Sequence, residues 1–378
     1  MQGVAVGWEV YELTSDPLNL GYVGLVQFLP LVALVIVAGH VTDAYNRKTV
    51  LMAALGLNAL ADVGLAWNSA SAGPLYATYS FLFVTGIARS FQNPSRAALL
   101  PRIVPRSVFP NAVTWNSSGF ELATMAGPAL GGLLLYFGSP ALVYTLNGVA
   151  ALAFMILIAG VAYDHKAQEK VPVTLASLLA GLSYIRRSQV VLGAIMLDMF
   201  GVLLGGATAL MPVFARDILN VGELGLGFLV AGPAMGAFSM ALFQAHRPPL
   251  ARAGRTLLLT VAGFGIVTIL FGLSETFAIS MLMLFFVGAC DNISVVIRST
   301  LVQLLTPDEM RGRVSAINFL FVGTSNDLGG FESGLVASLF TPVISVVSGG
   351  IGTIAVVALI AWRMPALRHY GALVEKDP

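Results

Sequence analysis

Charged residues are scarce in this sequence. Asp, Glu, Lys and Arg together make up 10% of its 378 residues, whereas hydrophobic residues make up 57%. A soluble domain carries about 25% charged residues, so this chain cannot cover a water-facing surface. The scarcity excludes an ordinary soluble enzyme, a disordered protein and a nucleic-acid-binding protein. The formal net charge of +1 also argues against a polybasic binding surface.

Cysteine is almost absent as well. Cys290 is the single cysteine, which excludes an intramolecular disulfide framework and the usual cysteine zinc sites. The sequence has no glycine-rich phosphate-binding loop with a lysine, so nothing supports an ATP-driven pump. No nucleophile–base set or metal-ligand set supports a membrane-embedded enzyme. We therefore expect no enzymatic activity, no cofactor and no metal, and what remains is an integral membrane protein.

Long apolar runs fill most of the chain. They exceed the alternating segments of about 10 residues that are typical of barrel strands, so they predict helices, which satisfy their own backbone groups in lipid. A spanning helix takes about 20 residues. Eleven spans are predicted, near 20–42, 48–68, 74–98, 108–136, 140–163, 189–215, 222–245, 255–273, 276–302, 313–340 and 342–363.

Residues 1–13 are apolar and helix-like but too short to span. At about 1.5 Å per residue they reach about 20 Å, against a hydrocarbon core about 30 Å thick. A signal peptide is a poor alternative, because no basic flank precedes the run. We expect a twelfth helix that is cut short at this end.

Lysine and arginine are distributed unevenly between the connections that join the predicted spans. Of the 20 basic residues, 17 fall in one set of alternate connections or in the C-terminal tail, while the opposite connections contain only Arg216. Arg89 and Arg298 fall inside spans. The positive-inside rule makes the basic side cytoplasmic. We therefore predict a multi-pass protein of the inner (plasma) membrane with a cytoplasmic C-terminus.

The two halves of the chain repeat at an offset of 202 residues. Gly86, Arg96, Leu99, Pro105, Asn116, Gly127 and Gly132 recur as Gly288, Arg298, Leu301, Pro307, Asn318, Gly329 and Gly334. A single offset held over nearly 50 residues indicates a duplication. Two halves related in this way are typical of a transporter that rocks about a central cavity.

The longest polar stretch separates these halves. It is followed by an amphipathic segment, which we expect to lie along the cytoplasmic interface. The sequence therefore predicts an N-terminal transmembrane bundle over 1–163, a cytoplasmic linker with an amphipathic helix over 164–188, and a C-terminal bundle with a short cytoplasmic tail over 189–378.

A first motif joins the second and third helices, and its matching residues are Gly39, Asp43, Arg47 and Lys48. We expect the glycine to let two helices approach closely and the aspartate to accept hydrogen bonds at a helix N-terminus. The two basic residues hold the loop in cytoplasmic water. The stretch resembles the Gly-x-x-x-Asp-(Arg)-x-Gly-Arg-(Arg/Lys) signature of the major facilitator superfamily, with Ala44 and Asn46 replacing the common Arg and Gly. The alternative is a turn with ordinary positive-inside charges.

A second motif lies in the fifth span and contains Gly127, Pro128, Gly131 and Gly132. Proline kinks a helix by removing one hydrogen bond, and glycines permit close packing. The motif resembles the Gly-Pro-x-x-Gly-Gly antiporter motif of exporters in this superfamily, although a tight helix interface alone would explain it. Three more stretches are similar to the branch that contains enterobactin exporters and macrolide-type efflux proteins: 7–14, 93–101 and 325–334.

This resemblance implies an all-α integral membrane protein with the major facilitator fold, in which two pseudo-symmetric six-helix bundles enclose a central cavity. It implies a secondary transporter that exports a small organic molecule, a drug or a siderophore-like compound, by alternating access. We expect proton antiport by a monomer in the lipid bilayer, with no nucleic acid as partner. The alternatives are an exporter of lipid-like substrates with a different coupling, and a non-transporting membrane scaffold or sensor that keeps the fold.

Ionisable residues inside spans are costly and usually face a cavity or a partner. By the resemblance, Glu9 and Glu121 are the leading proton carriers and Arg89 modulates them, although a static ion pair would also explain Arg89. We expect Asp62 to be peripheral and Arg298 to reach the cytoplasmic interface. The remaining candidates for cavity or substrate contacts are Asn93, Asn116, Asp198, Asp291, Asp327 and Glu332.

Overall fold

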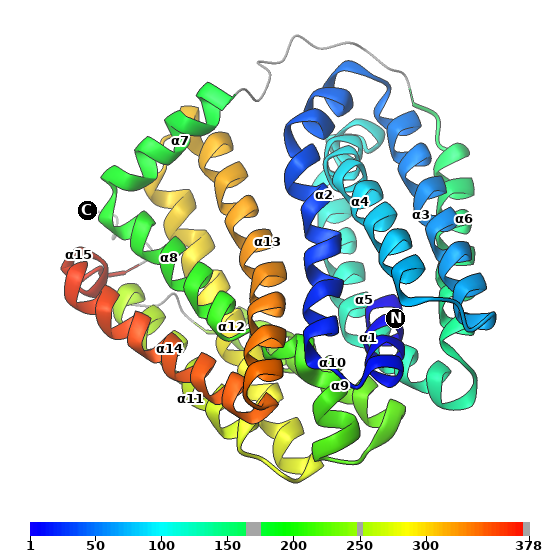
Figure 1. Cartoon of the computed structure of the whole chain (residues 1–378). Helices are drawn as coiled ribbons and strands as arrows, with labels where there is room; N and C mark the ends of the chain where they lie inside the picture. The colour runs from blue at the N-terminus through cyan, green and yellow to red at the C-terminus, as the bar shows by residue number, and fades with distance from the viewer. Residues whose placement is uncertain (164–174, 248–251, 373–378) are drawn as a thin grey trace. The chain divides into compact units, whose positions relative to one another are not determined.

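The computed structural model describes residues 1–163, 175–247 and 252–372, and this part of the chain contains helices and no strands (Figure 1). Contacts divide the chain into two units at residue 174, with residues 16–21 grouped with the second unit. The predicted boundaries of bundles and linker stay predictions, and the polar stretch at 164–174 lies outside the described residues.

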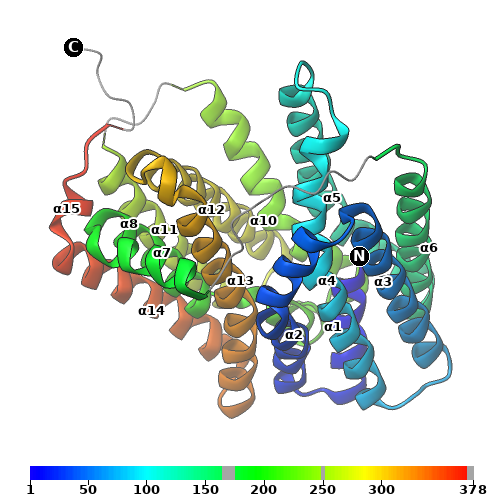
Figure 2. The ribbon, with the colours of Figure 1, turned by 90° about the horizontal axis from the view of Figure 1, so that it is seen from above.

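The first unit is built from six helices. They are α1 (Gln2–Thr14), α2 (Pro17–Ala44), α3 (Arg47–Ala70), α4 (Leu75–Ile103), α5 (Phe109–Phe137) and α6 (Pro140–Ala159). The third of these, α3, packs against both α4 and α6 (Figure 2). Its start is fixed by Asn46, whose side-chain oxygen accepts hydrogen bonds from the backbone N–H groups of Lys48 and Thr49.

The second unit begins with the short helix α7 (Leu175–Arg187). The long helices that follow are α8 (Gln189–Leu204), α10 (Gly222–Ala245), α11 (Ala253–Gly272), α12 (Phe277–Leu305), α13 (Asp308–Leu339) and α14 (Pro342–Arg363), and α15 (Pro365–Arg368) ends the described chain. The α12 helix packs against α10 and α11, and α11 also packs against α14.

One predicted span is not a single helix. The sequence predicts a continuous helix over 189–215, but α8 ends at Leu204, and η1 (Ala207–Leu210), α9 (Met211–Val213) and the π-helical turn η2 (Phe214–Ile218) follow. Backbone packs directly on backbone at this break. A Cβ added at Gly349 would lie 2.0 Å from the Leu204 carbonyl oxygen, and one at Gly206 would lie 2.8 Å from the Gly329 carbonyl carbon. The neighbouring helices therefore support the interruption, as membrane-embedded irregular backbone requires.

The 202-residue repeat is also present in the structure. The bounds of α4 and α12 are offset by 202 at both ends. At the same offset, Ser139 and Thr341 cap α6 and α14 by accepting a backbone hydrogen bond, and a proline follows each of them. The buried faces of α4 and α12 share Leu82 and Leu284. The helices α4 and α6 thus have counterparts in α12 and α14 that are built from the same local signals.

Nine helical segments among the described residues are long and apolar enough to cross a membrane. Ten of the eleven predicted spans coincide with single helices, and the span predicted over 189–215 covers α8 and the broken segment after it. The helices α4 and α13 are not among the nine. The first helix, α1, has 13 residues, as its sequence predicts. The chain is an all-α, multi-pass membrane protein.

Candidate functional site

Polar side chains in the first unit converge on Asp62, which lies on α3 and is 0% exposed. Gln2 Nε2 donates a hydrogen bond to Asp62 Oδ1 at 3.0 Å. Asn58 Nδ2 and Asn147 Nδ2 donate to Oδ2 at 3.1 and 2.8 Å. Gly148 leaves room for this carboxylate, because an added Cβ would lie 3.2 Å from the Asp62 Cβ. The carboxylate of Asp62 thus joins α1, α3 and α6, and the expectation that it lies away from the central cavity stays a prediction.

The predicted proton carriers lie in different surroundings. Glu9 on α1 accepts a hydrogen bond from the hydroxyl of the fully buried Tyr144 at 2.6 Å. Arg89 on α4 is exposed and interacts electrostatically with Asp62. Glu121 on α5 is exposed. Asp62, rather than a glutamate, therefore lies at the centre of the buried polar network of this unit.

A second charged site lies within the second unit. Arg298 on α12 forms an ion pair with Asp198 on α8, and the two residues are 5% and 7% exposed. The expectation that Arg298 extends to the cytoplasmic interface is therefore wrong. A buried ion pair offsets the desolvation of both groups only when they stay together, so this contact fixes α8 against α12.

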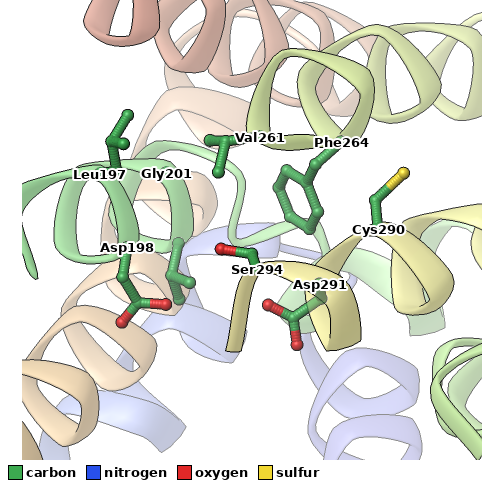
Figure 3. A pocket seen from close by; sticks show the side chains of 9 residues that line it. Leu197, Asp198, Gly201, Val261, Phe264, Cys290, Asp291 and Ser294 are labelled. Atoms are coloured by element: carbon green, nitrogen blue, oxygen red, sulfur yellow. The ribbon is translucent and has the colours of Figure 1, made fainter. Parts of the chain in front are cut away.

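A small cavity lies beside the Asp198–Arg298 pair (Figure 3). Asp198 lines it from α8, Asp291 and Ser294 line it from α12, and Phe264 lines it from α11. In Figure 3 the carboxyl groups of Asp198 and Asp291 lie on the same side of the cavity. The remaining lining residues are Leu197, Gly201, Val202, Val261 and Cys290.

The motif between α2 and α3 uses its lysine to join two helices. Lys48 Nζ donates hydrogen bonds to the backbone oxygens of Ala159 and Val161 at 2.7 Å each, so its charge lies at the C-terminal end of α6. Arg47 is buried. A Cβ added at Gly39 would meet no described atom within 4 Å, so the expected close helix approach at Gly39 stays a prediction. The Asp43 side chain lies outside the described residues.

The glycines of the second motif face α1. A Cβ added at Gly131 would lie 3.0 Å from the Met1 Cα, and one at Gly127 would lie 3.6 Å from the Met1 nitrogen. Gly132 is buried, and Pro128 lies inside α5. The motif therefore lets α5 approach the first residues of the chain.

The other candidate residues lie on α4, α5 and α13. Asn93 is exposed on α4, and Asn116 on α5 is exposed and accepts a hydrogen bond from Arg96 Nη2 at 3.0 Å. Asp327 and Glu332 are partly buried on α13. Whether any of them contacts a substrate stays a prediction.

Sequence reasoning missed the amides that bind Asp62. Asn58 and Asp62 are four residues apart, which puts them on one face of α3, and Asn147 interrupts an otherwise apolar helix. Since polar side chains inside spans seek polar partners, this spacing was a usable signal. Gln2 carries no comparable signal, because it lies far from its partner Asp62 in the sequence. The same holds for Tyr144 and its partner Glu9.

Nearly the whole chain matches one protein family. The family described as transmembrane secretion effector, a division of the major facilitators, matches residues 1–373. The chain belongs to the major facilitator superfamily. This membership explains the internal repeat and the two helical units. It also shows that the protein is of the membrane-transporter class and not an enzyme.

Curated relatives within the superfamily include enterobactin exporters. The enterobactin exporter EntS of Escherichia coli O9:H4 (strain HS) is 26% identical over 373 residues, which cover 97% of this chain and 88% of the relative. The EntS protein of Shigella boydii serotype 18 (strain CDC 3083-94 / BS512) matches with the same identity and coverage.

Solved major facilitator structures share the fold. The inward-open xylose transporter XylE from E. coli has a TM-score of 0.70 at 14% identity, covering 96% of this chain and 92% of the other. A mutant of the peptide transporter POT has a TM-score of 0.75 at 12% identity, covering 99% and 92%. At these identities the similarity shows the fold alone.

Proposed function

We propose that this protein exports a small organic molecule, a drug or a siderophore-like compound, across the inner membrane by alternating access, and that entry of protons drives the export. The observation that carries this proposal is the similarity to the enterobactin exporters, which covers 97% of the chain. The antiporter-like motif at Gly127–Gly132 and the sorting of basic residues, which would put the C-terminus in the cytoplasm, support it.

The coupling would use carboxylates whose protonation changes with the side to which the transporter is open. A ligand shifts a two-state equilibrium only through its different affinities for the two states, and the same holds for a proton. Glu9 and Glu121 are proposed as proton carriers and Arg89 as the cation that modulates them. The motif of Gly39, Asp43, Arg47 and Lys48 would stabilise one of the two states, and a monomer would suffice for the cycle.

The test uses the purified full chain in proteoliposomes with an imposed pH gradient. The probes are ethidium, a macrolide and a catecholate siderophore, and the flux of each across the vesicle membrane is measured. We expect gradient-dependent flux of at least one probe. If none moves, the proposal of export is wrong and a non-transporting scaffold is favoured.

Coupling is tested separately with Glu121→Gln. This variant should lose pH-driven flux but keep measurable binding of the transported probe, because the neutral amide cannot release a proton. Glu275→Gln is the matched control, since Glu275 is an exposed glutamate in the turn between α11 and α12. Undiminished pH-driven flux in Glu121→Gln would remove Glu121 from the proton path.

A further inference from the structure

The cavity in the second unit has an unbalanced charge. Two carboxylates, Asp198 and Asp291, line it, and one guanidinium, that of Arg298, is bound to Asp198. If both aspartates are ionised, one negative charge remains without a cation. Isolated charges inside a membrane protein are costly, so this excess calls for a bound positive species.

Asp291 carries the excess charge. Asp198 is satisfied by its ion pair, whereas Asp291 has no hydrogen bond or ion pair with any residue that the structure describes. Asp291 is partly buried, and its carboxyl group borders the cavity beside the phenyl ring of Phe264 (Figure 3). A carboxylate without a donor in such a place is unfavourable, and protonation removes the charge.

The internal repeat gives an independent comparison. At the offset of 202 residues that relates α4 to α12, Asp291 corresponds to Arg89. In the first unit, Arg89 interacts electrostatically with Asp62 on α3. At the corresponding place on α11 the second unit has Phe264 and Gly265, and neither carries a charge. The same repeat position thus holds a cation with a nearby acid in the first unit, Arg89, and an acid without a nearby cation of its own in the second unit, Asp291.

The chemistry of the lining favours a proton over a metal cation. Metal cations such as Mg²⁺ and Ca²⁺ need about six or more oxygen ligands. The side-chain oxygens in this lining come from Asp198, Asp291 and Ser294, and Asp198 is already bound to Arg298. A single proton needs only one carboxylate oxygen.

The other groups around Asp291 do not supply a competing charge. The lining residues from α11 are apolar. Gln244 on α10 is uncharged, and its amide donates a hydrogen bond to Asn292, the residue after Asp291. The α13 helix contributes no lining residue. Cys290 adds a thiol on α12, and Asp198 and Arg298 add the ion pair. We propose that Asp291 is the proton-binding acid of the second unit, and that it takes up one proton in the cavity it shares with Asp198.

The role of this proton in transport rests on the proposed antiport, but its binding can be measured without a substrate. Purified full chain would be titrated with acid in an infrared difference experiment that detects the C=O stretch of a protonated carboxylic acid. A pH-indicator dye would count the protons taken up. We expect a carboxylic-acid band in the unmodified protein that Asp291→Asn abolishes, together with the loss of about one bound proton.

Three further variants sharpen this test. Asp291→Glu should move the band rather than remove it, which keeps the test informative if Asp291→Asn does not fold. Asp198→Asn should weaken the Asp291 band, because Arg298 then lacks its partner and its charge favours an ionised Asp291. Glu275→Gln, which changes an exposed carboxylate in the same unit, should leave the band unchanged. Absence of the band in the unmodified protein, or its persistence in Asp291→Asn, would overturn the proposal.

Sodium distinguishes the two possible cations. If added Na⁺ at fixed pH removes the band, Na⁺ displaces the proton from Asp291, and the assignment of this site to a proton alone is wrong. If the band survives Na⁺ but no probe moves in proteoliposomes, proton binding by Asp291 stands and the proposed antiport fails.

Discussion

The buried network around Asp62 yields a quantitative prediction. Its carboxylate accepts three hydrogen bonds, one at Oδ1 from Gln2 and two at Oδ2 from Asn58 and Asn147. Asp62→Leu leaves three amides without an acceptor, and each unsatisfied buried donor costs about 1–3 kcal/mol. Gln2 is buried and the two asparagines are partly buried, so we expect this variant to lose about 3 kcal/mol of unfolding free energy, more than the loss of one acceptor would cost. Asp62→Asn keeps one carbonyl oxygen for the two asparagines and loses only the acceptor of Gln2, so we expect it to lose about 1–3 kcal/mol.

The assay is equilibrium unfolding in mixed micelles with increasing SDS, followed by far-UV circular dichroism. Glu12→Gln is the control, because Glu12 is an exposed carboxylate on α1 and should change stability little. The order of stability should be unmodified protein, then Asp62→Asn, then Asp62→Leu. The reasoning is refuted if Asp62→Leu is as stable as Asp62→Asn, because the amides would then not depend on the carboxylate.

Two further predictions concern the second unit. Gly288→Ala should abolish the yield of monodisperse protein in gel filtration, because the new Cβ would lie 1.8 Å from the Pro233 carbonyl oxygen. Gly119→Ala, which meets nothing within 4 Å, should behave normally, and equal yields would contradict the packing argument. Asp198→Asn should lose about 3–5 kcal/mol in SDS unfolding, and adding Arg298→Gln should recover most of it. Additive losses would show that the two charges do not act as a pair.

Much of the fold could be predicted because the membrane imposes simple rules. Apolar length fixes where helices lie, and the starts of α6 and α14 follow from a capping hydroxyl and a proline at Ser139-Pro140 and Thr341-Pro342. The break after Leu204 could not be predicted, because the sequence there is as apolar as its surroundings. It depends on close approach by Gly329 and Gly349, which are more than a hundred residues away.

The candidate sites were harder to predict, because charge placement in a bundle depends on distant partners. Arg298 lies near one end of its span, so snorkelling to the interface was a reasonable prediction, yet Asp198, 100 residues earlier, binds it. Position on the third helix predicts that Asp62 lies away from the central cavity, but it could not predict that residues on α1 and α6 donate hydrogen bonds to its carboxylate. Sequence pattern identified which residues are costly to bury, and only the packing of helices showed which of them share a partner.

The position of Cys290 offers a natural labelling site beside the cavity of the second unit. It is the single cysteine in the chain, and it lines the cavity that holds Asp198 and Asp291. A thiol-specific fluorophore or spin label added to the unmodified protein would therefore attach at one defined place beside these acids. Spectroscopy of that cavity needs no cysteine-free background and no engineered attachment site, so the wild-type sequence can be observed directly.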